Sequence, residues 1–253
     1  MKITDQERNK IIKLCEKYNI ENYTIKDDGT VYVNGDVDLE SMGLKELPLK
    51  FGIVNGYFDC ADNELTSLEG SPKKVDDYFN CSNNELTSLE GAPKEVIGSF
   101  YCNKNQLTSL VGGPEKVGGD FWCNVNQLTS LVGAPKEVIG SFYCDFNELT
   151  SLVGSPKKVG GGFYCYNNKL NSLVGAPEKV GDSFYCYNNQ LTSLVGSPKE
   201  VTGWFDCSYN KLTSLIGAPL IVRGYFYCYN NPKDNPKELE QPLTIIYGKF
   251  INI

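Results

Sequence analysis

The chain has 253 residues, with 24 Lys and Arg against 31 Asp and Glu, and its net charge of −7 is unfavourable for binding a nucleic-acid backbone. It contains no histidine, which excludes Cys–His and Ser–His catalytic arrangements, so we expect no enzymatic activity and no cofactor. No stretch approaches the roughly 18 apolar residues that suggest a membrane span, and we expect no membrane partner.

The first 36 residues are predicted to form an N-terminal cap. Residues 4–7 (TDQE) match a capping box, and apolar residues at helical spacing follow over 11–18. Residues 23–33 are typical of a β-hairpin that turns at Asp28-Gly29. The first residues lack the apolar core of a signal peptide, so we expect a cytoplasmic protein.

Residues 37–231 are predicted to form a solenoid. Nine cysteines, from Cys60 to Cys228, recur at intervals of 21 residues, each with Phe two residues before it and Asn three residues after it. A degenerate coil begins earlier, at Val37 and Leu39. A unit this short cannot bury its own apolar face and must stack on its neighbours. We therefore expect about ten coils.

Each unit is predicted to contribute one short parallel strand. In the stretch F-x-C, Phe and Cys share one face of the strand and the residues beside Cys share the other. Gly and Pro then turn the chain, as in residues 86–96 (LTSLEGAPKEV), whose Leu and Val positions recur as core positions. We interpret the repeated Cys as core thiols rather than metal ligands, and the repeated Asn as a partner of buried backbone groups.

Residues 232–253 are predicted to form a C-terminal cap. The sequence Asn235-Pro236-Lys237-Glu238 is typical of a helix start, and residues 244–253 suit a closing strand or hairpin. A solenoid whose two ends are both covered does not stack on further copies, so we expect a monomer.

The repeat resembles the leucine-rich repeat, whose signature is L-x-x-L-x-L-x-x-N-x-L. Residues 79–86 (FNCSNNEL) match the last eight positions of that signature, with Phe and Cys in place of two leucines. The first leucine is absent, and Val stands one residue earlier. The 21-residue unit and its L-T-S-L-x-G-x-P-K sequence resemble the short variety encoded by tailed phages and some large viruses. The resemblance implies a mostly β solenoid with one short parallel strand in each coil.

The residues on either side of each Cys are the candidate binding residues. Strand alternation places them on the outward face, where large rings and carboxylates gather and Lys and Arg are nearly absent. Tyr and Trp lose little entropy on docking, and acidic groups favour a partner with basic groups. Alternatively, the rings form a ladder that only stiffens the solenoid. The partner-binding candidates are Tyr101, Trp122, Tyr143, Asp145, Tyr164, Tyr166, Tyr185, Tyr187, Asp206, Tyr227 and Tyr229.

Three functional hypotheses follow from this face. The leading one is a non-enzymatic scaffold that binds a partner protein; by the viral resemblance, this would be a host protein, met in the host cytoplasm. Tyr and Trp beside Asn and Asp also suit glycan recognition, which is the second hypothesis. The third is a structural protein that packs against copies of itself.

Overall fold

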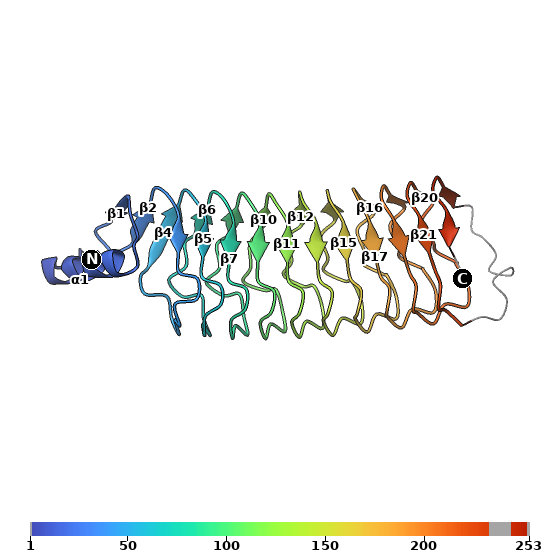
Figure 1. Ribbon diagram of the computed structural model, residues 1–253, viewed down its shortest axis with the longest axis horizontal. Coiled ribbons are helices and arrows are strands. Elements are labelled where there is room, and N and C mark those ends of the chain that lie inside the picture. Colours follow the sequence, from blue (N-terminus) through green and yellow to red (C-terminus); the bar gives the residue numbers. More distant parts are fainter. Residues whose placement is uncertain (1, 233–243, 252–253) are drawn as a thin grey trace.

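The computed structural model describes residues 2–232 and 244–251. The chain is wound into a mostly β solenoid whose coils follow one another along a nearly straight long axis, with a helix at the N-terminal end (Figure 1). Each coil contributes two short strands, similar in colour in Figure 1, and these belong to two different sheets that run along the solenoid. The predicted solenoid of about ten coils is therefore confirmed.

Helix α1 (Asp5–Lys17) begins at the predicted capping box. Thr4 Oγ1 accepts a hydrogen bond from the Glu7 amide, and the Glu7 carboxylate accepts one from the Thr4 amide. Cys15 on this helix is fully buried, and Ile11, Leu14 and Tyr18 pack against the core. The predicted hairpin follows as an antiparallel pair, and its second strand pairs with the first coil in parallel. Helix and hairpin thus cover the first coil.

The F-x-C strands form one sheet, which we call the aromatic sheet. Identical positions of neighbouring coils pair in parallel, so that Phe121 lies beside both Phe100 and Phe142. The strands of this sheet are β3 (Val37–Asp38), β5 (Phe58–Asp59), β7 (Phe79–Asn80), β9 (Phe100–Tyr101), β11 (Phe121–Trp122), β13 (Phe142–Tyr143), β15 (Phe163–Tyr164), β17 (Phe184–Tyr185), β19 (Phe205–Asp206), β21 (Phe226–Tyr227) and β23 (Phe250–Ile251).

A second sheet, which we call the charged sheet, lies on the return side of each coil, so the prediction of one strand per coil was wrong. The exact 21-residue period brings equivalent backbone groups together there as well, and they pair. Its strands are β1 (Tyr23–Ile25), β2 (Val31–Val33), β4 (Phe51–Val54), β6 (Lys74–Val75), β8 (Glu95–Val96), β10 (Lys116–Val117), β12 (Glu137–Val138), β14 (Lys158–Val159), β16 (Lys179–Val180), β18 (Glu200–Val201), β20 (Ile221–Val222) and β22 (Ile245–Ile246).

The core between the sheets is built from repeated columns. The Phe rings of consecutive coils from Phe58 to Phe205 stack with centroids 5.3–5.6 Å apart, and they are fully buried together with the Cys and Leu columns. The turn that follows needs glycine: Gly133 has φ +97°, and a Cβ there would lie 2.3 Å from the Val111 amide nitrogen.

Each repeated Asn joins two coils by hydrogen bonds. Asn147 Nδ2 donates to the carbonyl oxygens of Cys123, Cys144 and Asp145 at 3.1–3.2 Å, and its Oδ1 accepts from the Leu128 amide at 2.9 Å. These backbone groups lie in the interior, where an unpaired group is costly. The predicted structural role of the Asn column is therefore confirmed by its contacts.

The C-terminal segment continues both sheets. Strands β22 and β23 pair in parallel with β20 and β21, so residues 244–251 form no hairpin, unlike one of the two predicted alternatives. The predicted helix start at 235–238 lies outside the described residues. No helix in the described ranges is long and apolar enough to cross a membrane.

Candidate protein-binding surface

The outward side of the aromatic sheet carries the predicted binding residues. Each two-residue strand points its Phe inward and its second residue outward, and the residue after Cys points outward as well. We call this outward surface, with the residues before each Phe and the two residues after each Cys, the strand face.

The rings before Cys form a continuous ladder along the strand face. The ring centroids of Trp122 and Tyr143 are 3.9 Å apart, and those of Tyr143 and Tyr164 are 4.6 Å apart. Tyr101 adjoins Trp122 at 6.0 Å, and Tyr185 adjoins Tyr164 at 5.3 Å. The parallel register causes this arrangement, because it places equivalent side chains side by side.

The rings after Cys widen the ladder at its centre. Tyr166 and Tyr187 stack at 4.5 Å with their planes 9° apart, and Phe146 meets Tyr166 edge-on at 5.6 Å. Tyr187 also lies 6.3 Å from Tyr185, which joins the two columns. Seven of the predicted residues therefore form one cluster: Tyr101, Trp122, Tyr143, Tyr164, Tyr166, Tyr185 and Tyr187.

The other two predicted tyrosines belong to a second cluster near the C-terminal end. Tyr227 and Tyr229 lie 6.4 Å apart, and Tyr227 contacts Trp204 and Tyr225 at about 6 Å. In the part of the chain that the structure describes, no ring pair joins this cluster to the first one. Where the two clusters adjoin, Asp206 occupies the position before Cys that Tyr185 and Tyr227 occupy in the neighbouring coils.

Four rings of the strand face were missed by the sequence analysis. They precede Phe, a column that was not considered, and they are Tyr57, Tyr78, Trp204 and Tyr225. Tyr57 and Tyr78 stack at 4.8 Å, and Tyr78 extends the ladder to Tyr101. A signal was present: the three coils with Asp59, Asn80 and Asp206 before Cys all have a ring before Phe, as does the coil of Tyr227, whereas the coils from 99 to 183 have Ser, Asp or Gly there.

The carboxylates of the strand face are more buried than expected. Asp145 is only 2% exposed and Asp59 only 8%. Burial raises the pKa of Asp145, Asp59 and Asp206, because the low dielectric disfavours the charged form. Asp206 is partly compensated by the Ser208 amide, which donates to it at 2.9 Å. These acids are thus held close to the rings rather than spread into solvent.

The hydroxyls of Tyr164 and Tyr185 stay protonated at neutral pH. Burial raises the pKa of Tyr164 to about 12, with nearby Tyr143 as the next cause, and it raises the pKa of Tyr185 too. Neutral phenols offer flat apolar surface with a hydrogen-bonding group at the edge, which is a combination common at protein interfaces.

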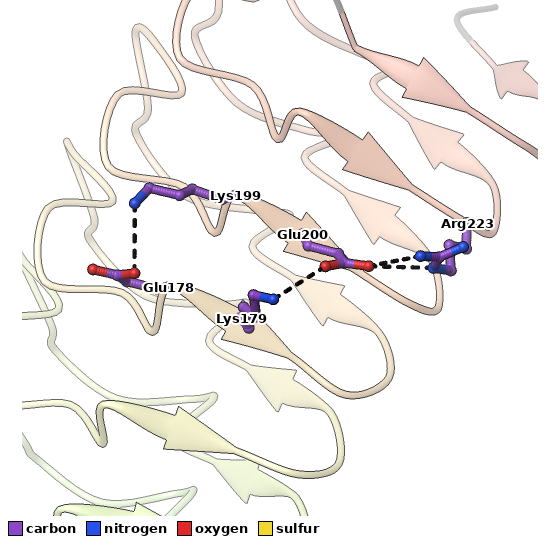
Figure 2. A network of polar contacts seen from close by, with 5 residues as sticks. All are labelled: Glu178, Lys179, Lys199, Glu200 and Arg223. Carbon is purple, nitrogen blue, oxygen red and sulfur yellow. Dashed lines mark hydrogen bonds and ion pairs between the residues drawn. The ribbon is translucent and has the colours of Figure 1, made fainter.

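The charged sheet differs from the strand face because many of its charged side chains form ion pairs with one another. Figure 2 shows Glu200 between Lys179 at 3.5 Å and Arg223 at 2.9 Å, beside the pair of Lys199 and Glu178 at 3.5 Å. The hydrogen bonds from Arg223 lower the pKa of Glu200, with Lys179 adding to the effect. A hollow of about 830 Å³ lies over this sheet near Ile139. On the strand face, by contrast, the acids form no ion pair with any described residue, and the central coils carry a single lysine, Lys104.

The thiols offer no reactive site. All ten cysteines are free and buried, and burial raises the pKa of Cys15 to about 11 and that of Cys228 to about 12. Among the described residues, no three His, Cys, Asp or Glu side chains are grouped so that they could hold a metal ion. The cysteines therefore act as core residues.

Comparison with known proteins supports the fold. No protein-family model matches the chain, and no curated protein matches it. Among solved structures, the chain is similar to YopM from Yersinia enterocolitica WA-314, with a TM-score of 0.54 and 18% sequence identity. The match covers 86% of this chain and 55% of the YopM chain, so this chain spans about half the length of that protein. The likeness shows a leucine-rich-repeat solenoid fold.

Proposed function

We propose that this protein is a non-enzymatic scaffold and that its strand face binds a partner protein with exposed basic groups. The observation that carries the proposal is the ladder of rings from Tyr57 to Tyr185, each in contact with the next. Contiguous apolar surface of this extent on a soluble protein typically marks an interaction site. A leucine-rich-repeat solenoid is consistent with such a role.

The stacking of the rings supports binding as well as stability. A ring that its neighbours already hold in place loses little conformational entropy when a partner docks, and Tyr and Trp are enriched among the residues that dominate binding energy. The ladder therefore offers a preformed surface. Its stiffening role and its binding role are compatible.

The charge of the strand face supports a basic partner. Asp59, Asp145 and Asp206 lie within or beside the rings, and acidic residues from the first coils extend the negative surface. The charged sheet offers no comparable excess, because its Lys and Glu side chains neutralise one another. Complementary charge directs a basic surface toward the strand face.

The surroundings in which the protein works are part of the proposal. Ten free thiols suit a reducing compartment, which supports the cytoplasm. The phage-like repeat sequence supports a viral protein that acts on a host protein in the host cytoplasm. The helix and hairpin over the first coil support a monomer. The missing histidine supports the absence of Ser–His and Cys–His catalysis.

A quantitative pull-down with three forms of the protein tests the proposal. The strand-face variant carries Trp122→Ala, Tyr143→Ala, Tyr164→Ala and Tyr185→Ala, and the control variant carries Ile97→Ala and Ile139→Ala on the charged sheet, where both side chains are exposed. We expect wild type and control to retain the same basic proteins and the strand-face variant, checked for folding, to lose at least nine-tenths of them. Equal recovery by all three forms contradicts the proposal. Glycan binding lost only in the strand-face variant supports glycan recognition instead.

A further inference from the structure

Two neighbouring coils at the middle of the ladder combine features that no other pair of described coils combines. We call them the central patch, and they contribute Trp122, Asn124, Val125, Tyr143, Asp145 and Phe146. Within this patch lie a close ring stack, a buried acid, unpaired polar atoms and strained backbone positions.

Two residues of the central patch are poorly suited to a backbone conformation that every coil adopts. The second residue after each Cys has a left-handed φ of 51–55° in every coil, and Asn or Asp occupies this position in five of the nine coils. Val125 and Phe146 take it here, although β-branched and bulky residues are disfavoured in this conformation. Both side chains are exposed, at 41% and 51%. Because Asn fits the turn better, these side chains are best explained by a contact outside the chain.

Polar atoms of the central patch are buried without partners. Asp145 Oδ1, Asn124 Oδ1 and Trp122 Nε1 form no hydrogen bond, and they are three of only six such side-chain atoms in the described part of the chain. Asn124 Nδ2 approaches the other carboxylate oxygen of Asp145, but only at 3.5 Å, and the Tyr166 hydroxyl lies near the same carboxylate. Buried polar groups are normally satisfied, so unpaired atoms beside an exposed apolar surface indicate a ligand that supplies the missing bonds.

We propose that the central patch is the anchor of the binding surface and that it takes an arginine side chain of the partner. This inference rests on the proposed function, since it names the group that the same surface recognises. The guanidinium stacks on the exposed ring of Phe146, because the faces of Tyr143 and Tyr164 are covered by their neighbours in the ladder. It donates hydrogen bonds to Asp145, and Asn124 Oδ1 accepts a further one. Trp122 Nε1 donates to a backbone carbonyl of the partner segment.

Arginine fits this patch better than lysine for physical reasons. Its guanidinium is planar, stacks on aromatic faces and presents several N–H donors in fixed directions, whereas the lysine ammonium is compact and strongly hydrated. Asp145 is nearly inaccessible, as are Asn124 Oδ1 and Trp122 Nε1, so binding requires that the side chains over them move, and it leaves the ion pair shielded from water. Shielding strengthens the attraction between the two charges.

The two tryptophans provide the test. Trp122 lies in the central patch and Trp204 lies in the separate C-terminal cluster, so the two indole N–H signals in a ¹⁵N–¹H spectrum report on the patch and on a reference. The probes are N-acetylarginine amide and its neutral isostere N-acetylcitrulline amide. We expect a saturable shift of the Trp122 signal with the arginine probe, at least tenfold weaker binding of the citrulline probe, and at least tenfold loss in Asp145→Asn. Asp77→Asn removes an exposed charge in a distant coil and is expected to bind as wild type does.

Several outcomes overturn the proposal. The first is a Trp122 signal that does not shift when the arginine probe is added. The second is equal binding of the arginine and citrulline probes by the wild-type protein. The third is equal binding of the arginine probe by Asp145→Asn and by wild type. Including Asp145→Asn in the pull-down separates this inference from the proposed function. If Asp145→Asn retains the partner and the strand-face variant loses it, the arginine anchor is wrong while the scaffold stands; if the strand-face variant also retains it, both are wrong.

Discussion

Trp122 and Tyr143 stack with their ring centroids 3.9 Å apart and their planes 24° apart, the shortest separation among the aromatic pairs of the described chain. They occupy equivalent positions in neighbouring coils, and the parallel register brings them together. The same contact that stabilises the two coils also holds two flat surfaces ready for a partner. We therefore expect Trp122 and Tyr143 to contribute both to the stability of the solenoid and to the binding of a partner.

The stacking of Trp122 on Tyr143 is expected to show energetic coupling. Aromatic pairs contribute about 0.5–1.5 kcal/mol beyond the area that they bury. In a double-mutant cycle of Trp122→Ala and Tyr143→Ala, urea unfolding should give a coupling free energy in that range. Strictly additive losses would show that the two rings do not stabilise each other.

Asn147 is expected to be among the most sensitive residues of the core. Asn147→Ala removes the partner of the Leu128 amide and of three carbonyl groups, and it should lower the free energy of unfolding by about 3 kcal/mol or more. The control is Gln127→Ala, whose side chain is exposed in the preceding coil and which should change stability by less than about 0.5 kcal/mol. Similar effects of the two changes would contradict the structural role of the Asn column.

The strained residues of the central patch are expected to lower stability. Val125→Asn and Phe146→Asn restore the residue type that suits the left-handed conformation, so each should raise the free energy of unfolding by about 1 kcal/mol. As a control, Asn167→Val places a β-branched residue at the equivalent left-handed position of another coil and should lower the free energy of unfolding by a similar amount. A loss of stability in Val125→Asn would show that the wild-type side chain stabilises the solenoid itself.

The stability of the fold is expected to depend on the ionisation of Asp145. Because burial raises its pKa above the ordinary value of 3.8, the folded protein binds the proton more tightly than the unfolded chain does. The ionised carboxylate therefore destabilises the fold at neutral pH, and this penalty disappears as the pH falls below 3.8. Asp145→Asn should be more stable than wild type at pH 7, by an amount on the order of 1 kcal/mol, and the two should converge in acid. A less stable variant at pH 7 would mean that the carboxylate stabilises the coil.

The cysteines of the native protein are expected to be unreactive toward thiol reagents. All ten are buried, and burial raises their pKa, so little thiolate forms and little of it is accessible. An aromatic disulfide reagent at pH 8 should modify none of the ten in the native protein within minutes and all ten in denaturant. Rapid reaction of several native thiols would contradict a packed Cys column.

The period of the sequence was sufficient to predict the core. Phe, Cys, Leu and Asn recur at fixed positions, and a short unit can bury them only by stacking. The second sheet was not predicted, because a two-residue strand such as Glu95–Val96 has no alternation to detect and is defined only by its neighbours. The burial of Asp145 was missed for a related reason, since its exposure depends on side chains from adjacent coils. The rings before Phe could have been found from the sequence. The coils that lack a ring before Cys, at Asp59, Asn80 and Asp206, carry one before Phe instead.

Site-specific photo-crosslinking tests the central claim most directly. Benzoylphenylalanine replaces Tyr164 on the strand face in one variant and Ile139 on the charged sheet in another, and both variants are irradiated with the partner that the pull-down identifies. We predict a covalent adduct with a basic segment of the partner at position 164 and none at position 139. An adduct at position 139 alone, or equal adducts at both positions, would contradict recognition by the strand face.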